Sequence, residues 1–178
     1  DVVSLPEGPQ AIYYWRDWHA AVEPICRCIK KECADAYVIA CASDPGIEAA
    51  RASTSVPVIG IFRAAVATAI VRGERFGIIA LIEASKSRHL AALRAMGLET
   101  RLAVEIALNF SMDTLLDGDA ARSVLIEAAR SCTEAGADSV ILGCTGMAHH
   151  KDAIAAAAGV PVIEPCQTGL ALAVSAVL

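Results

Sequence analysis

The chain has 178 residues with a formal net charge of −5, and 56% of its residues are hydrophobic against 20% charged. An acidic chain offers no basic field for nucleic acid or anionic lipid, and no apolar run in it is long enough to span a bilayer. The seven cysteines, an odd number, and the lack of a signal-like start favour reduced thiols in the cytoplasm. Composition therefore favours a soluble protein with a small-molecule partner rather than a nucleic acid or a membrane.

The N-terminal part contains an aromatic cluster and a helix. Residues 13–18, Tyr-Tyr-Trp-Arg-Asp-Trp, concentrate aromatic side chains, and a helix with one apolar stripe continues to about residue 32. Apolar residues at helical spacing are typical of a packing patch, whereas a loop-borne aromatic cluster is also typical of a lid over a ligand. The sequence leaves both interpretations open.

Cys41 stands at the carboxyl end of a short, apolar predicted strand, the edge at which open parallel sheets bind their ligands. Ser-Asp-Pro-Gly follows at 43–46 and predicts the start of a helix, with Ser43 or Asp44 as its cap. A thiol beside a helix start faces unpaired N–H groups and the positive end of the helix dipole, both of which lower its pKa. A single cysteine here could equally be a small buried hydrophobic residue.

A strand, a helix and another strand are predicted at 56–61, 62–71 and 76–82. Ser-Lys-Ser at 85–87 then occupies the next strand-to-helix turn. The hydroxyl and N–H of Ser85 could hold a carboxylate or imide oxygen. Helix capping would explain the serine as well.

After a further strand and a long helix, a second buried strand ends on Cys144. Gly143 and Gly146 bracket this cysteine, and Thr145 follows it directly. Glycines let the backbone approach a ligand closely, which is the arrangement that an oxyanion or enolate pocket needs.

The two cysteine strands are copies of one unit. Ala-Asp-Ala-Tyr-Val-Ile-Ala-Cys at 34–41 and Ala-Asp-Ser-Val-Ile-Leu-Gly-Cys at 137–144 are each followed by a turn, an alanine-rich stretch and Val-Pro-Val-Ile, at 56–59 and 160–163. The repeat predicts two pseudo-symmetric halves with doubly wound parallel sheets. The second half carries a strand and a helix that the first half lacks, so the register predicts that these lie upstream of the sequence.

Two cysteines that face each other suit the removal of a proton from one face of a carbon and its return from the opposite face. One cysteine must then be a thiolate and the other a thiol. The carbanion between them needs an adjacent carbonyl and fixed N–H donors. The sequence shows no glycine-rich nucleotide motif, no lysine placed for pyridoxal phosphate and no recognised metal spacing. We therefore expect chemistry without a cofactor or a metal.

A family resemblance is carried by the two cysteine strands, the turns after them and the last strand. These segments are residues 36–41, 43–46, 140–147 and 160–163. They resemble the aspartate/glutamate/hydantoin racemase superfamily and, within it, the hydantoin and allantoin racemases. The resemblance implies an α/β fold of two pseudo-symmetric, doubly wound parallel-sheet domains with the active site between them. It also implies cofactor-independent racemisation, Cys41 and Cys144 as the acid/base residues, and a homo-oligomer.

The repeat and the resemblance together predict the domain boundaries. Residues 1–75 plus 165–178 form the first α/β domain, which lacks its N-terminal strand and helix. Residues 76–164 form the second α/β domain, and the last helix packs on the first half.

The residues beside the cysteines bear on the substrate. Amino-acid racemases of the superfamily usually follow the first cysteine with Asn-Thr, whereas Ala42 and Ser43 stand here. Hydantoin racemases commonly carry a bulky aromatic residue in place of Ala42. The first departure argues against free aspartate or glutamate, and the second indicates a different substrate side chain. The resemblance implies a 5-substituted hydantoin or an allantoin-like cyclic ureide as substrate, and we expect five residues to bind it: Ala42, Ser43, Ser85, Thr145 and Gly146.

Two other classes of function remain open. Maleate cis-trans isomerases and arylmalonate decarboxylases resemble the same family, and the presence of both cysteines argues against the decarboxylase more than against the isomerase. A non-catalytic protein that binds a small molecule between the domains is the third hypothesis. It would not require reactive thiols at Cys41 and Cys144.

Overall fold

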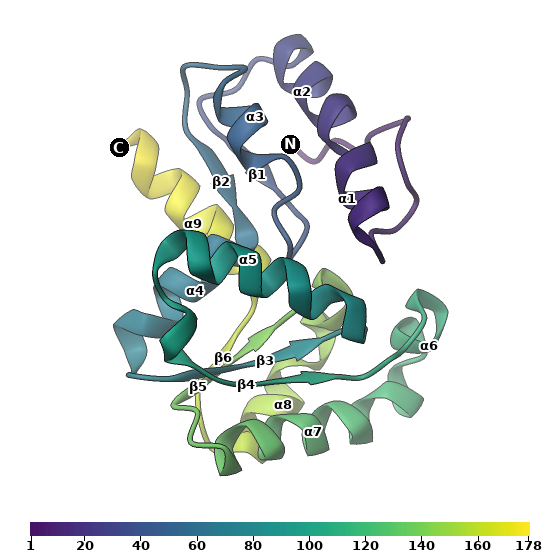
Figure 1. The fold of residues 1–178 in the computed structure, drawn as a ribbon, viewed down its shortest axis with the longest axis vertical. Helices are drawn as coiled ribbons and strands as arrows, with labels where there is room; N and C mark the ends of the chain where they lie inside the picture. The colour runs from purple at the N-terminus through teal and green to yellow at the C-terminus, as the bar shows by residue number, and fades with distance from the viewer.

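The computed structural model describes the backbone of residues 1–178 and the side chains of residues 1–117 and 121–178. The strands form two parallel sheets, a first sheet of order β1-β2 and a second sheet of order β4-β3-β5-β6. Helices cover both sheets (Figure 1). The predicted α/β class with parallel sheets is thereby confirmed. In the part of the chain that the structure describes, no helix is both long and apolar enough to cross a membrane.

The N-terminal third of the chain builds the first sheet. Its elements are α1 (Trp15–Ala20), α2 (Val22–Lys31), β1 (Tyr37–Ile39), α3 (Ile47–Arg51) and β2 (Val58–Gly60). The short strands follow the predicted apolar runs, and β1 and β2 run side by side as the repeat requires.

The second sheet and its helices come from the rest of the chain. The α-helices are α4 (Ile61–Arg72), α5 (Lys86–Met96), α6 (Met112–Leu116), α7 (Gly118–Glu134), α8 (Lys151–Ala158) and α9 (Pro165–Val177). The strands are β3 (Phe76–Ala80), β4 (Leu102–Ala107), β5 (Ser139–Leu142) and β6 (Val162–Ile163). Short 3₁₀ turns are η1 (Glu83–Ser85), η2 (Glu99–Arg101) and η3 (Thr145–His150). α6 is a short helix in the connection between β4 and α7.

Apolar side chains cover both faces of the second sheet. α4 and α5 pack on one face through residues that include Phe62 and Leu93. α7 and α8 pack on the other face through residues that include Leu125 and Ile154. Helices on both faces explain why β3 and β5 are buried along their whole length and read as continuous apolar runs.

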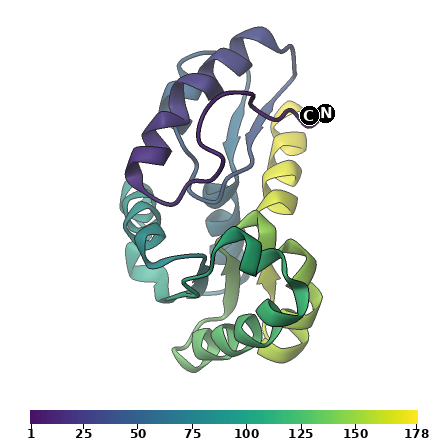
Figure 2. The same cartoon turned by 90° about the vertical axis from the view of Figure 1, so that its right-hand side faces the viewer.

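The first sheet is also covered on both faces. α2 and α3 pack on it through a cluster that includes Ile29, Ile39 and Ile47. α9 contacts both β1 and β2, and Gly169 of α9 lies against the side chain of Val38. Figure 2 shows the chain's last helix beside the first sheet, as the sequence predicted.

α4 and α9 pack against each other, and α9 also packs against both strands of the first sheet (Figure 1). α4 follows β2 directly in sequence, yet its buried face belongs to the core of the second sheet. The first sheet is therefore joined to the second by shared helices as well as by the chain itself. The division into 1–75 plus 165–178 and 76–164 stays a prediction.

Candidate active site

The two predicted cysteines lie at equivalent places. Cys41 follows β1 and Cys144 follows β5, each after one intervening residue, and each of these strands has the next repeat strand as its parallel neighbour. Both side chains are partly exposed. The negative charge of a thiolate at Cys41 raises the pKa of Cys144.

Burial is the largest influence on the Cys41 thiol, and it raises the pKa of this group. The hydroxyl of Ser43, whose Oγ lies 3.6 Å from Cys41 Sγ, and the Ser43 N–H act in the opposite direction. The nearby charge of Asp44 raises the pKa and that of Arg88 lowers it. The expectation that this position lowers the thiol pKa is wrong for the protein without substrate, because desolvation outweighs the hydrogen bonds.

The turn after Cys41 also differs from the prediction. α3 begins only at Ile47, after Gly46 in a left-handed conformation with φ of 65°, and no side chain caps it. Ser43 and Asp44 therefore do not cap this helix, which begins six residues after Cys41. Asp44 itself has a positive φ of 46°, a conformation that aspartate tolerates better than most residues.

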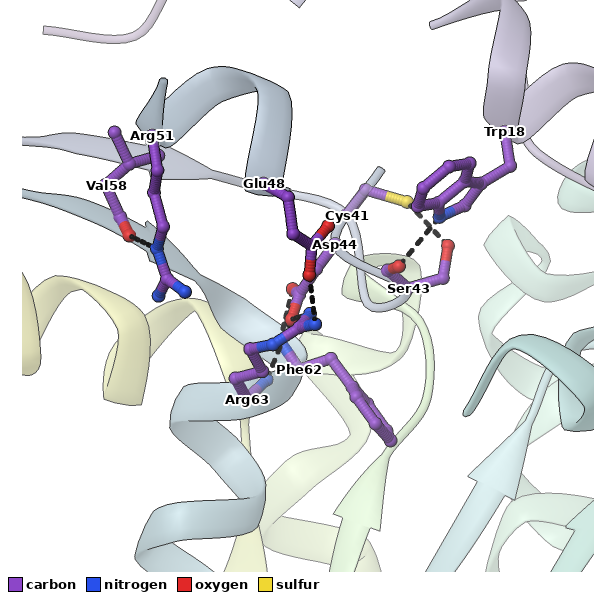
Figure 3. Close-up of polar contacts among 9 residues, drawn as sticks. All are labelled: Trp18, Cys41, Ser43, Asp44, Glu48, Arg51, Val58, Phe62 and Arg63. Atoms are coloured by element: carbon purple, nitrogen blue, oxygen red, sulfur yellow. Dashed lines mark hydrogen bonds and ion pairs between the residues drawn. The ribbon is translucent and has the colours of Figure 1, made fainter. Parts of the chain in front are cut away.

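Asp44 caps a different helix from the predicted one. Its side chain is 0% exposed, and its carboxylate accepts hydrogen bonds from the N–H groups of Phe62 at 2.8 Å and Arg63 at 3.0 Å, at the start of α4. The Arg63 guanidinium lies 3.2 Å from the same carboxylate and also contacts Glu48 at 2.8 Å (Figure 3). The Asp44 N–H donates to the carbonyl of Cys41 at 2.9 Å. Asp44 thus fixes the Cys41 turn against α4.

The glycines around Cys144 serve close packing within the protein. A Cβ at Gly143 would lie 2.5 Å from the carbonyl oxygen of Ile79, and a Cβ at Gly146 would lie 2.9 Å from Leu115 Cδ2. The close approach predicted at these positions is therefore made to protein neighbours. Burial raises the pKa of Cys144, and a hydrogen bond from the Gly146 N–H lowers it.

The five predicted substrate-binding residues divide into two groups by exposure. Ala42, Ser43 and Ser85 are buried, whereas Thr145 and Gly146 are partly exposed. Ala42 and Ser43 belong to the Cys41 turn, and Thr145 and Gly146 to the turn after Cys144. Ser85 follows β3, the neighbour of β5 in the second sheet.

Arg88 is a buried charge that sequence reasoning missed. Its side chain is 3% exposed and its Nη2 donates to Ser85 Oγ at 3.2 Å. Its remaining hydrogen bonds go to the backbone carbonyls of Ile12, Tyr13 and Ala84. Nothing in the local pattern marked Arg88, because these partners are mostly distant in sequence. Since Ser85 Oγ accepts from Arg88, the hydroxyl hydrogen of Ser85 remains available to a substrate oxygen.

A third thiol lies close to the pair. Cys166 follows β6 at the start of α9, where the buried carboxylate of Glu164 accepts from the N–H groups of Cys166 at 2.9 Å and Gln167 at 2.7 Å. Burial, the neighbouring Glu164 charge and thiolates at Cys144 and Cys41 together raise the pKa of Cys166 to about 11. At neutral pH Cys166 is therefore an uncharged thiol.

A hollow of about 500 Å³ opens at the carboxyl ends of β3 and β4, and its walls are formed by Tyr13, Tyr14, Ile82, Glu83, Ala84, Asn109, Phe110 and Ser111. Open parallel sheets bind ligands at this edge. Neither Cys41 nor Cys144 lines the hollow. Within the described residues, no group of three or more His, Cys, Asp or Glu side chains is placed to hold a metal ion.

Comparison with known sequences gives consistent matches along the whole chain. The family model for Asp/Glu/Hydantoin racemase matches residues 1–173. A hydantoin racemase from Pseudomonas sp. (strain NS671) is 32% identical over 176 residues, which cover 96% of this chain and 71% of the relative. A hydantoin racemase from Paenarthrobacter aurescens is 32% identical over 158 residues, 88% of this chain and 67% of that relative.

A solved structure shares the fold. Allantoin racemase from Klebsiella pneumoniae superposes with a TM-score of 0.88 at 27% sequence identity, over 96% of this chain and 71% of that chain. The sequence matches, the superposition and the paired cysteine turns agree with one another. The chain belongs to the Asp/Glu/Hydantoin racemase family.

Proposed function

We propose that this protein is a cofactor-independent racemase of 5-substituted hydantoins or allantoin-like cyclic ureides, with Cys41 and Cys144 as its two acid/base residues. One observation carries the proposal: two partly exposed thiols stand at matched strand ends of a repeated unit, in a chain related to hydantoin racemases. The substrate lies between the two cysteine turns, one from each half of the repeat.

The ring carbon of such a ureide carries a hydrogen that the adjacent carbonyl acidifies. A thiolate at Cys41 takes this proton and becomes a thiol, and the electron pair moves onto the carbonyl oxygen as an enolate. The thiol of Cys144 then gives its proton to the opposite face of the carbon and becomes a thiolate. The opposite enantiomer reacts with the two roles exchanged, and no other reactant is consumed.

The enolate oxygen needs fixed hydrogen-bond donors. The Ser85 hydroxyl is one, because Arg88 occupies its acceptor side at 3.2 Å. The backbone N–H of Thr145 is a further donor on the Cys144 side, where the Gly146 N–H binds the Cys144 sulfur. Ala42 and Ser43 form the wall on the Cys41 side, where the small side chain of Ala42 leaves room for the substituent of the ring.

A panel of single-enantiomer hydantoins and allantoin tests the substrate class. We expect the optical rotation of at least one ureide to fall to zero in the presence of the protein, above the rate of a blank without protein. Maleate and an arylmalonate are run in parallel. If every ureide keeps its rotation while one of these two is converted, the function is that of an isomerase or decarboxylase instead. If nothing is converted, the binding-protein hypothesis replaces the racemase.

The pH dependence follows from the raised pKa of both thiols. Burial holds the pKa of Cys41 and Cys144 above the ordinary thiol value of 9.0, so little thiolate exists at neutral pH. We expect kcat/KM to rise almost tenfold per pH unit from about pH 7 to 8.5, as the thiolate fraction grows. At higher pH the second thiol also ionises, the proton donor is lost and the rate falls. A rate that stays flat or declines between pH 7 and 8.5, after subtraction of the blank, contradicts this assignment.

A further inference from the structure

The aromatic cluster of the sequence lies in a segment that connects the two halves of the site. We call residues 12–18 the strap. The strap includes the start of α1, and Figure 2 shows α1 reaching from the first sheet toward the helices of the second. Its contacts on both sides are hydrogen bonds to residues far away in sequence, so the strap is more than a local packing patch.

One end of the strap is bonded to the second half of the chain. Arg88 of α5 donates to the carbonyl oxygens of Tyr13 at 3.0 Å and Ile12 at 3.4 Å. The Tyr13 hydroxyl accepts from the N–H of Met112 at 3.2 Å, at the start of α6. The indole of Trp15 donates to Ser87 Oγ at 3.0 Å.

Burial makes the Arg88 contacts costly to lose. The guanidinium is 3% exposed, and no carboxylate among the described residues lies within ion-pair distance of it. A buried charge without hydrogen-bond partners is strongly unfavourable, so the carbonyls of the strap are part of what allows Arg88 to be buried. The side chain of Asp17 also accepts from the N–H groups of Tyr13 and Tyr14, which fixes the turn at this end.

The other end of the strap is bonded to the Cys41 turn. The Trp18 indole donates to the carbonyl oxygen of Ser43 at 2.9 Å, and the hydroxyl of the same serine lies 3.6 Å from Cys41 Sγ (Figure 3). Trp18 itself does not hydrogen-bond to the thiol. It holds the residue whose hydroxyl does.

We propose that Trp18 is a positioning residue for Cys41: through the carbonyl of Ser43, the strap holds the Ser43 hydroxyl against the thiol and ties this turn to α5. The catalytic role of Cys41 in this proposal rests on the proposed function. The contacts from Trp18 to Ser43 and from Ser43 to Cys41 do not depend on it. Cys144 receives its own hydrogen bond from Gly146, which is not a residue of the strap.

The test is the pH profile of alkylation by iodoacetamide, measured without substrate and resolved for Cys41 and Cys144 by peptide mass spectrometry. Trp18→Phe keeps the ring but removes the N–H that binds Ser43. Its matched control is Trp15→Phe, which removes the exposed hydrogen bond to Ser87. In Trp18→Phe we expect the midpoint for Cys41 to rise by about half a pH unit or more, because the Ser43 donors that favour the thiolate are no longer held in place. The midpoint for Cys144 stays unchanged, and Trp15→Phe changes neither midpoint.

An unchanged Cys41 midpoint in Trp18→Phe overturns the proposal, and so does an equal shift of both thiols, which would indicate general loosening. In a Ser43→Ala background the same substitution should shift the Cys41 midpoint less than in the wild type. Should Trp18→Phe fail to fold, Trp18→Met, whose flexible apolar side chain also lacks the N–H that binds Ser43, takes its place and should give the same selective shift. If the ureides are not substrates but the selective shift is found, the strap stands and the proposed function alone fails.

Discussion

We expect Cys41→Ser and Cys144→Ser each to lower the rate of racemisation by about 10³-fold or more, because a serine hydroxyl cannot replace a thiolate base or a thiol acid at neutral pH. Both effects should appear in kcat rather than in KM, since the substrate contacts of the two turns remain. The rate of loss of optical rotation measures them. Cys33→Ser is the matched control, because Cys33 is an exposed thiol outside the site, and we expect it to keep the wild-type rate.

The two serine variants should also differ from each other. Each retains the cysteine that serves one face of the carbon, so each should still exchange the ring hydrogen of one enantiomer with solvent without inverting it. The enantiomer whose ring hydrogen exchanges should be the opposite one in the two variants. Racemisation at the wild-type rate in either variant would show that the paired thiols are not the acid and the base.

The largest loss of stability is expected from Asp44→Ala. Removal of the carboxylate leaves the Arg63 guanidinium without its buried partner and the N–H groups of Phe62 and Arg63 without an acceptor. Breaking a buried pair of this kind costs about 3–5 kcal/mol. Alanine is in addition less tolerant than aspartate of the positive φ at this position. Urea unfolding followed by circular dichroism measures the change in the free energy of unfolding.

Two further variants show whether the cap is responsible. Asp44→Asn keeps one of the two oxygen acceptors at the start of α4 and tolerates the positive φ, so its loss should be smaller than that of Asp44→Ala. Glu48→Gln removes only the exposed partner of Arg63, and such pairs contribute about 0–1 kcal/mol. Equal losses in Asp44→Ala and Glu48→Gln would contradict the assignment of Asp44 as the buried cap of α4.

Patterns that are local in sequence predicted much of the fold. The strands at 37–39 and 139–142 follow directly from short β-branched runs, and their duplication predicted that two cysteines occupy equivalent strand ends. The parallel pairing of each cysteine strand with the next repeat strand also follows from the repeat. Burial on both faces makes such strands visible as continuous apolar runs.

The details that tune the site depend on contacts between distant residues. Asp44 was predicted to cap the helix that follows it, but its partners are Phe62 and Arg63 at the start of the next helix but one. The sequence around Arg88 resembles that of an exposed helix face, so nothing in it predicts a buried arginine. The backbone carbonyls of the strap that bind Arg88 come close to it only in the folded protein. The pKa of Cys41 is raised mainly by burial, and burial depends on the fold and not on the residues next to Cys41 in the sequence.

The most direct test of two-base racemisation is the deuterium content of both enantiomers at early conversion. The wild-type protein converts one pure enantiomer of its ureide substrate in deuterated water, and the reaction is stopped after a few per cent conversion. The two enantiomers are then separated, and the deuterium content of each is measured by mass spectrometry. If Cys144 delivers a solvent-derived proton while Cys41 removes the original one, the product carries one deuterium at the ring carbon and the remaining substrate carries none. A product that retains the original hydrogen would mean that a single base serves both faces, and the account of the cysteine pair would be wrong.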